Sequence, residues 1–327
     1  MKICLLDKTL FSYNSNDLNT FKLRGAETVL INIANSLMEF GHKVTVINNC
    51  PKNEKISNIN WLNINNLTQK SFFDLAISNN DCCLFDKVNT KKKILLSHSV
   101  QGIEKFIRKK QFFSYFKHKP KIAILGKYHL KKRSFITRFF GYFFLPYGID
   151  KIFLETKLNN LDNIDKNLAI FNSRNDRNLD LLIDIWVKDI HPNYKSGKLL
   201  ITPKNNYLNM DSNIYPRVTG DRQIMIDNLS SSRVLLLPGH KAELFCLAAE
   251  EARELCLPII TLGIGSLSER VVHGKTGFVA KNNKEFSDYA IEIFKNDKLW
   301  NNLRSNLLNL RGSKTWNKCA QTLLNNI

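Results

Sequence analysis

The chain has 327 residues, 43% of them apolar, which is an ordinary fraction for a globular protein and enough length for two domains. No stretch approaches the roughly 18 apolar residues of a membrane span, and the start MKICLLDKT becomes polar too early for a signal peptide, so we expect a cytoplasmic protein. Seven cysteines without a C-x-x-C pair and seven histidines without H-x-H or H-x-x-x-H spacing predict reduced thiols and no metal site.

The net charge of +19 is unevenly distributed along the chain. Residues 105–149 contain twelve Lys and Arg, no Asp or Glu, and many interleaved aromatic residues. A basic and aromatic surface of this kind suits an anionic membrane surface. The alternative is a solvated basic face with part of the Phe residues in the core. No nucleic-acid-binding motif accompanies the charge, so we do not expect nucleic acid as a partner.

The first residues predict a strand–loop–helix–strand unit. Residues 2–6 form an apolar run typical of a buried strand, and residues 8–23 are polar and predict a loop. Apolar residues then recur at helical spacing from Val29 to Met38, and a further strand is expected at residues 43–47. Gly25 at the helix start would let an anionic ligand approach the backbone, although an ordinary helix start explains it equally well.

The rest of the first half continues this alternation. After an irregular Asn-rich stretch, the expected elements are strands at 75–78, 81–85 and 94–97, a helix at 105–116 and a strand at 122–125. The third of these strands ends at His98, which would face a ligand crevice at the carboxyl edge of a parallel sheet. A strand-end histidine satisfied by the backbone is the alternative.

A polar segment at residues 157–167 predicts a linker, after which the pattern resumes with a strand at 168–171. Arg174 and Arg177 lie on the loop between this strand and the next expected helix. Guanidinium groups carry a fixed charge and forked donors, so this loop is suited to a diphosphate.

Two strand–loop–helix units follow each other in residues 234–279. A buried strand at 234–237 is followed by a Pro-Gly loop, Glu243 just before a helix, and Glu251 about two turns inside it. Another strand is expected at 258–262, followed by a Gly-Ile-Gly turn that opens another helix. Both glutamates therefore lie on the ligand edge of the sheet.

The chemistry of this edge suggests a sugar joined to a nucleoside through a diphosphate. Backbone amides at the helix start would attract the phosphates, Glu251 could accept two ribose hydroxyls, and Glu243 could hold a second polyol. Each residue also has a simpler explanation. Glu251 could be an exposed helix residue, and Glu269 could cap its helix together with Ser266.

The segment AELFCLAAEEARELCLPIITLGIGSLSERVVHGKTGFV resembles the donor-site region of family 4 glycosyltransferases, which have the GT-B fold. The matching residues are Glu243, Glu251, Ala252, Pro258, Glu269, Gly274, Thr276 and Gly277. RGAETVLINIANSLMEFGHKVTV resembles the first helix of that family, LPYGID its interdomain segment, and the helix around Trp316 its closing helix. The resemblance implies an α/β protein with two Rossmann-like domains facing across a cleft. We expect an acceptor-side domain at 1–150, a donor domain at 151–312, and a C-terminal helix at 313–327 that packs back toward the first domain.

The resemblance also implies roles for particular residues. Glu251 would bind the donor ribose, and Glu243 the transferred sugar. Arg174 and Arg177 would bind and neutralise the diphosphate, with Arg177 the less certain match because this loop is two residues shorter than in the family. The remaining residues implied at the site are Gly25 near the phosphates, His98 near the reacting sugar, and the backbone of Leu244, Phe245, Cys246 and Leu247 near the sugar and diphosphate. Two family glycines are replaced here, by Arg24 and Cys246.

The implied activity is a retaining, metal-independent and cofactor-free hexosyl transfer from a nucleotide sugar to a hydroxyl of a glycan or lipid-linked acceptor. Surface polysaccharide or lipopolysaccharide synthesis at the inner face of the cytoplasmic membrane is the expected setting. The diphosphate would leave from the face that the acceptor attacks, so the protein would act by positioning and by neutralising charge. The alternatives are an inactive GT-B scaffold or binding subunit, and a nucleotide-sugar epimerase.

Overall fold

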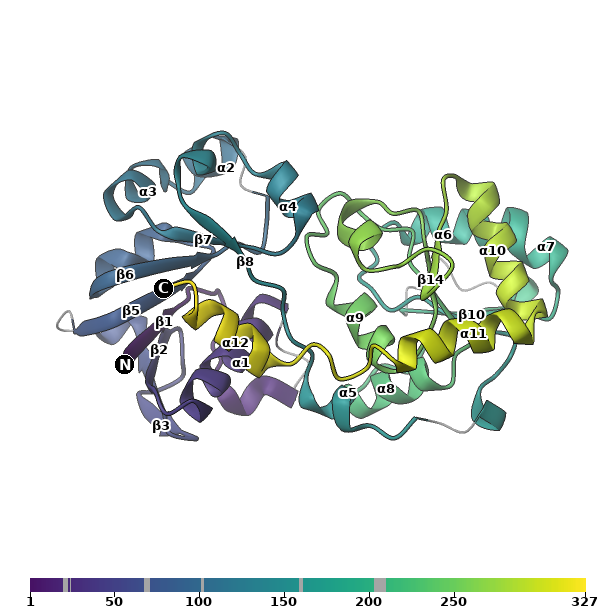
Figure 1. Ribbon diagram of the computed structural model, residues 1–327, viewed down its shortest axis with the longest axis horizontal. Helices are drawn as coiled ribbons and strands as arrows, with labels where there is room; N and C mark the ends of the chain where they lie inside the picture. Colours follow the sequence, from purple (N-terminus) through teal and green to yellow (C-terminus); the bar gives the residue numbers. More distant parts are fainter. Residues whose placement is uncertain (20–22, 24, 68–70, 101–102, 159–160, 203–209) are drawn as a thin grey trace. The chain divides into compact units, whose positions relative to one another are not determined.

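The computed structural model describes residues 1–19, 23, 25–67, 71–100, 103–158, 161–202 and 210–327. The chain divides into two compact units, each with its own sheet (Figure 1). Unit 1 comprises Met1–Gly148 and Lys314–Ile327, and unit 2 comprises Ile149–Ser313. None of the helices in the described ranges is both long and apolar enough to cross a lipid bilayer.

Unit 1 contains an eight-stranded sheet with the order β3-β4-β2-β1-β5-β6-β7-β8. All neighbouring strands pair in parallel except β3 and β4. The strands are β1 (Lys2–Leu6), β2 (Lys43–Asn48), β3 (Glu54–Ile56), β4 (Ile59–Asn63), β5 (Phe72–Asn79), β6 (Asn89–Leu96), β7 (Lys121–Ile124) and β8 (Tyr142–Phe144). The chain order reverses between β1 and β5, and in parallel sheets ligands bind at the carboxyl edge beside such a reversal.

The helices of unit 1 are α1 (Gly25–Glu39), α2 (Ile103–Arg108), α3 (Phe112–His118), α4 (Lys127–Lys132) and α12 (Trp316–Leu324). The last of them packs against α1, as Figure 1 shows. Its apolar face is buried, and Lys121 donates a hydrogen bond to the carbonyl of Asn326 (2.8 Å). Segments from the two ends of the chain therefore complete one core.

Three expectations for unit 1 are wrong. The stretch expected to be irregular contains β3 and β4, joined by Ser57 and Asn58, which both have positive φ (47° and 62°). This geometry is that of a two-residue hairpin turn. Residues 81–85 were expected as a strand, but Cys82–Lys87 form a 3-10 helix because the side chain of Asp81 caps it by accepting from the amide of Cys83 (2.9 Å). The helix expected at 105–116 is broken into α2 and α3.

Unit 2 contains a six-stranded parallel sheet with the order β11-β10-β9-β12-β13-β14. The strands are β9 (Leu168–Ile170), β10 (Lys198–Ile201), β11 (Ile214–Pro216), β12 (Val234–Leu236), β13 (Ile259–Thr261) and β14 (Gly277–Val279). The helices are α5 (Lys151–Glu155), α6 (Leu179–Ile185), α7 (His191–Asn193), α8 (Arg222–Ser230), α9 (Leu247–Glu254), α10 (Asn283–Lys295) and α11 (Asp297–Leu308). A π-helical turn over Trp186–Ile190 joins α6 to α7.

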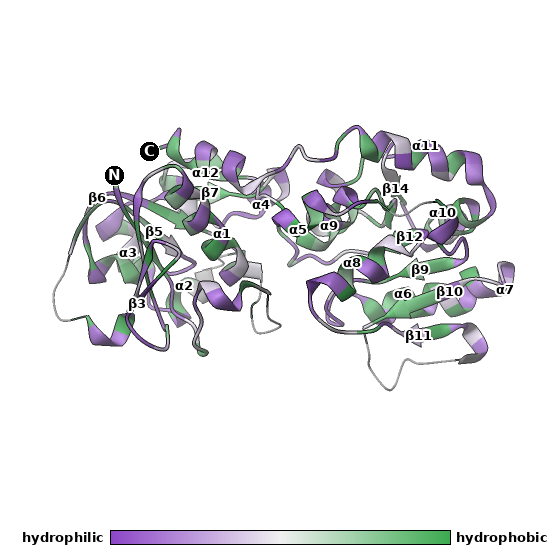
Figure 2. Cartoon of the chain, turned by 90° about the horizontal axis from the view of Figure 1, so that it is seen from below, coloured by the Kyte–Doolittle hydropathy of each residue, from purple (hydrophilic) through white to green (hydrophobic). Residues whose placement is uncertain are grey.

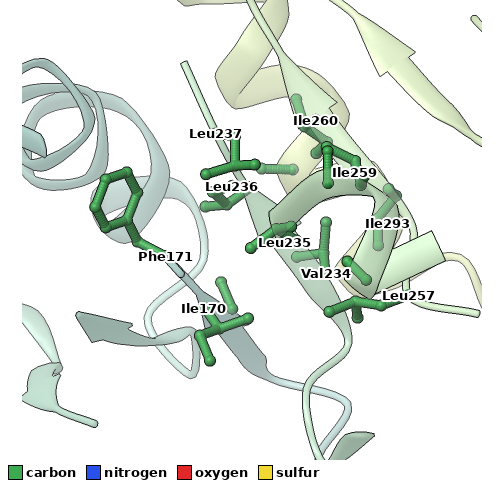
Figure 3. Packing of buried hydrophobic residues seen from close by; sticks show 14 of the residues in the cluster. Ile170, Phe171, Val234, Leu235, Leu236, Leu237, Leu257, Ile259, Ile260 and Ile293 are labelled. Atoms are coloured by element: carbon green, nitrogen blue, oxygen red, sulfur yellow. The ribbon is translucent and has the colours of Figure 1, made fainter. Parts of the chain in front are cut away.

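The central strands of unit 2 are apolar on both faces. Figure 2 shows β9 and β10 as mainly hydrophobic, and Figure 3 shows the side chains of β12 and β13 packed with Ile170 and Ile293. A parallel sheet covered by helices on both sides requires such continuous apolar strands. The buried strands cannot themselves hold polar groups, so the polar side chains of this unit gather on the loops at the strand ends.

Candidate active site

Two loops at the carboxyl ends of β9 and β12 are joined in unit 2. The side-chain amide of Asn178 donates to the carbonyl of Gly239 (2.5 Å). Arg177 reaches from the first loop to the second, where its Nε lies 3.4 Å from Oε2 of Glu243. The structure therefore brings Arg177 and Glu243 together, although they are far apart in the sequence.

Arg174 lies on the same loop but is exposed and already paired. Its Nε donates to Oδ1 of Asp176 (2.9 Å), and its Nη2 donates to the other carboxylate oxygen. This pairing raises the pKa of Arg174 and lowers the pKa of Asp176. An exposed ion pair contributes only about 0–1 kcal/mol, so an incoming diphosphate could displace Asp176 at little cost.

His240 is a site residue that the sequence reasoning missed. Its Nδ1 lies 3.0 Å from Nη1 of Arg177 and accepts from the backbone amide of Ala242 (3.1 Å). A neutral imidazole with Nδ1 as acceptor carries its proton on Nε2, which can then donate to a ligand. His240 could have been predicted as a candidate site residue, because it is a polar residue that directly follows the Pro-Gly turn after a buried strand.

Glu243 is held by its backbone as well as by Arg177. Its amide donates to the carbonyl of His240 (2.9 Å), and its carbonyl accepts from the amide of Ser266 (3.0 Å). Burial raises the pKa of the Glu243 carboxyl, while the charges of Arg177 and Arg174 act in the opposite direction. The result is a positioned carboxylate beside two guanidinium groups.

Helix α9 starts at Leu247, so Glu251 is its fifth residue and lies about one turn inside it rather than two. The acidic neighbours of Glu251 on this helix, Glu250 and Glu254, are buried and form ion pairs with arginines. Glu250 pairs with Arg270 (3.0 Å) and Arg253 (3.2 Å), and Glu254 pairs with Arg253 (2.6 Å). These ion pairs fix the rotation of α9.

Glu251 itself is half-buried and makes no hydrogen bond or ion pair within the described part of the chain. Burial raises the pKa of its carboxyl, and the nearby charge of Arg222 opposes this. The exposed-helix explanation therefore does not fit. A partly desolvated carboxylate without a partner is suited to accept hydrogen bonds from ligand hydroxyls.

Arg222 is the second residue that the sequence reasoning missed. It is the first residue of α8, after the N-cap Asp221, and forms a close ion pair with Asp150 of the LPYGID segment. Burial lowers the pKa of Arg222, and the charge of Glu251 opposes this. The LPYGID motif predicts Asp150 as a turn residue. The sequence around Arg222 gives no indication that Asp150 is the ion-pair partner of Arg222.

The residues between the two glutamates form a bend rather than the helix start itself. Leu244, Phe245 and Cys246 are buried and precede α9, and Leu247 opens it. Cys246 has φ 63°, a left-handed conformation that few residues other than glycine adopt. The resemblance places a glycine at this position, so the thiol occupies a backbone site suited to glycine.

The Gly-Ile-Gly turn does not open an α-helix. Residues Gly265–Glu269 form a 3-10 helix whose N-cap, Ile264, makes no side-chain cap. The hydroxyl of Ser266 is buried without a hydrogen-bond partner among the described residues, so the capping explanation for Glu269 is not supported. Glu269 has another interaction within the described residues.

His98 lies in unit 1, just after β6. Its amide donates to Oδ1 of Asn80 (2.8 Å), and its Nδ1 lies 3.0 Å from the hydroxyl of Tyr147. Its Nε2 is buried and has no hydrogen-bond partner in the described part of the chain. Burial, with a further contribution from His129, lowers the pKa of His98 to about 3, so the ring is neutral near pH 7. Backbone contacts alone therefore do not satisfy this histidine.

Gly25 is the first residue of α1 and is exposed. Arg24, which replaces a family glycine, lies outside the described residues. The predicted role of this helix start in phosphate binding stays a prediction.

Two parallel sheets flanked by helices define an α/β protein with two Rossmann-like domains, and solved structures with the GT-B fold match this chain along its whole length. Sucrose-phosphate synthase from Thermosynechococcus elongatus is 13% identical, with a TM-score of 0.70 over 99% of this chain and 97% of that one. HepE of Anabaena in complex with UDP-glucose is 14% identical, with a TM-score of 0.69 over all of both chains. WaaG, a glycosyltransferase involved in lipopolysaccharide biosynthesis, is 13% identical, with a TM-score of 0.70 over 100% of this chain and 99% of that one.

The sequence also matches a family model. Residues 213–308 match the model described as glycosyl transferases group 1. The match lies within unit 2. The predicted resemblance to this family and the predicted fold are confirmed. No curated protein sequence is significantly similar to it.

Proposed function

We propose that this protein is a retaining, metal-independent hexosyltransferase that uses a nucleoside-diphosphate sugar and a hydroxyl of a glycan or lipid-linked acceptor. The observation that carries the proposal is the carboxylate of Glu251, which has no hydrogen-bond or ion-pair partner among the described residues. Its neighbours Glu250 and Glu254 form ion pairs with Arg253 and Arg270 within unit 2. Glu251 is therefore the acid of α9 that is available to a ribose.

The second loop supports the diphosphate assignment. Arg177 and His240 contact each other beside Glu243, and Arg174 is held only by an exposed carboxylate. Two guanidinium groups and an imidazole N–H can neutralise the charge that develops on a leaving diphosphate. Glu243 would then orient the hydroxyls of the transferred sugar, and neither glutamate needs to transfer a proton.

The donor assignment is tested by calorimetric titration with UDP and UDP-glucose, since HepE was solved with both. Glu251→Ala should weaken binding by about 1–3 kcal/mol because ligand hydroxyls lose their acceptor. Glu251→Gln keeps one acceptor oxygen and should weaken binding less. Glu292→Ala, on the exposed face of α10, is the control and should bind as the wild type does. If neither nucleotide binds, a thermal-shift panel of other nucleotide sugars identifies the base, and equal affinity of wild type and Glu251→Ala for the best ligand would refute the ribose assignment.

Transfer is separated from the alternatives by the products. A transferase releases nucleoside diphosphate at a rate that depends on added acceptor, an epimerase converts the donor without acceptor, and an inactive scaffold does neither. We expect nucleoside diphosphate to be released only when an acceptor is present, and chromatography of the nucleotide measures this release.

We also propose that unit 1 binds an anionic membrane surface at the inner face of the cytoplasmic membrane. The aromatic residues of 105–149 fall into two groups, since Phe106, Tyr115, Phe140 and Phe143 are buried. The second group is strongly exposed, including Phe113 (83%), Phe135 (65%) and Phe139 (67%), and lies with the exposed Ile107 (69%) among exposed lysines. Exposed apolar side chains interleaved with cations favour the interface of an anionic bilayer.

Liposome flotation tests this membrane proposal. The wild type should float with vesicles that contain phosphatidylglycerol and not with pure phosphatidylcholine. Phe135→Ser combined with Phe139→Ser should reduce flotation severalfold. The matched control replaces Leu161 and Val218, exposed apolar residues of unit 2, by Ser. Equal flotation of both double variants would contradict the proposed surface.

A further inference from the structure

Unit 1 contains a small pocket that none of the assignments above uses. It lies where β6 and β7 end and is closed by the segment from α4 to the following 3-10 turn, Ile136–Phe139. Its polar lining consists of Ser97, His129, Arg133, Ser134 and Thr137. The lining contains no acidic side chain, and no Asp or Glu occurs in residues 105–149.

The guanidinium of Arg133 is the central feature of this pocket. Its Nε and Nη1 atoms are buried and have no hydrogen-bond partner among the residues that the structure describes. The group stacks on the ring of Tyr142, with Cζ 4.6 Å from the ring centroid, which fixes its plane and leaves its N–H edge for a ligand. Leaving a buried donor unpaired costs about 1–3 kcal/mol, and more for a charged group, so an acceptor at this edge would relieve a real penalty.

His129 adds a second donor. The backbone amide of Leu125 donates to its Nδ1 (3.2 Å), so the neutral ring carries its proton on Nε2. Burial, with a further contribution from Arg133, lowers the pKa of His129 to about 4, which keeps the ring neutral near pH 7. The hydroxyl of Thr137 donates to the carbonyl of Ser134 (2.8 Å), and the hydroxyl of Ser134 lies 3.5 Å from Thr137 Oγ1.

We propose that this pocket binds a phosphate group carried by the acceptor. Arg133, His129 and Ser134 all line the pocket, and phosphate offers the several oxygens that a guanidinium, an imidazole N–H and a hydroxyl can use. The assignment of this phosphate to the acceptor rests on the proposed function. The placement of the pocket supports it, because Ser97 of the lining directly precedes His98.

Two lining residues of the pocket are close in sequence to exposed aromatic residues. Phe135 directly follows Ser134, and Phe139 is two residues after Thr137; both Phe side chains are more than 60% exposed. A phosphate attached to a lipid and a phosphate on a soluble glycan share the chemistry that this pocket recognises. The experiment therefore includes one ligand from each source.

The test is calorimetric titration of the intact protein with inorganic phosphate in chloride buffer. Arg133→Met should weaken phosphate binding at least tenfold. Arg138→Met removes the same charge from an exposed position five residues away and should bind as the wild type does. Arg133→Lys retains the charge without the fork and should weaken binding severalfold, which keeps the test decisive if Arg133→Met does not fold. Equal weakening by Arg133→Met and Arg138→Met, or by neither, would overturn the proposal.

Competition then identifies the source of the phosphate. Glycerol 3-phosphate and vesicles of phosphatidic acid are each added to protein saturated with inorganic phosphate. Displacement by the vesicles alone assigns the group to a lipid, and displacement by glycerol 3-phosphate assigns it to a soluble ester. Displacement by neither would overturn the assignment to a phosphorylated acceptor.

Failure of this inference differs from failure of the proposed function. UDP binding depends on Glu251 in unit 2, whereas phosphate binding here depends on Arg133 in unit 1. Loss of Arg133-dependent phosphate binding with intact UDP binding refutes only the pocket. Arg133-dependent phosphate binding without binding of any nucleotide sugar refutes only the transferase.

Discussion

Gly265→Ala should damage both the stability of unit 2 and the donor site. Gly265 has φ +79°, where an alanine costs about 1–2 kcal/mol. A Cβ here would also overlap with the carbonyl oxygen of His240 and lie 3.0 Å from that of Glu243. Overpacking of this kind costs about 1–3 kcal/mol, so the free energy of unfolding should fall by about 2–5 kcal/mol in total. Because the displaced backbone carries Glu243, UDP-glucose affinity should fall as well.

Gly274→Ala is the matched control for this substitution. Gly274 has nearly the same φ, +73°, but nothing lies within 4 Å of the position of an added Cβ. It should lose only the backbone contribution of about 1–2 kcal/mol and keep its donor affinity. Urea unfolding followed by circular dichroism and calorimetric titration with UDP-glucose measure the two effects. If both variants lose the same stability and the same affinity, the close approach at Gly265 does not hold the Glu243 loop.

Four further outcomes follow from the same contacts. Burial raises the pKa of Asp7 from 3.8 to about 6, so the free energy of unfolding should decrease as the pH rises from 3.8 to about 6. Asp7→Asn should add up to about 3 kcal/mol to the free energy of unfolding at pH 7.5, and an unchanged urea midpoint would contradict this. Glu250→Ala leaves the buried Arg270 without the Glu250 carboxylate, while Arg253 keeps Glu254, and should cost about 3–5 kcal/mol in urea unfolding. The Glu251→Ala variant should unfold like the wild type. The pKa of His98 falls to about 3, so the stability that the neutral ring contributes above pH 6.5 should be lost as the pH falls toward 3. In His98→Asn the free energy of unfolding should therefore decrease less between pH 6.5 and pH 3; the same decrease as in the wild type would argue against a buried neutral ring. Glu243→Gln should lower turnover more than UDP affinity, which steady-state kinetics and calorimetry compare directly; a larger loss of UDP affinity would mean that Glu243 positions the diphosphate instead.

Local sequence patterns predicted the elements whose signal lies within a few residues. The apolar run of β1, the helical spacing of α1 and the continuous apolar residues of β12 each have periodicities that neighbours in sequence create. The resemblance that predicts a donor site at Glu243 and Glu251 likewise rests on one local segment of the sequence. The hairpin of β3 and β4 was missed because its turn residues, Ser57 and Asn58, are less specific signals than Asn-Gly.

Only the tertiary structure decided which charged groups remain available. The sequence has three glutamates close together, at 250, 251 and 254. In the structure, Glu250 and Glu254 form ion pairs with Arg270 and Arg253, whereas Glu251 does not. Arg222 and His240 entered the site, and Arg133 and His129 formed a pocket, through contacts between separate loops. The periodicity of apolar residues shows which face of a single segment is buried. The partner of a polar side chain depends instead on which strand ends lie side by side, and the strand order of the folded sheet decides that.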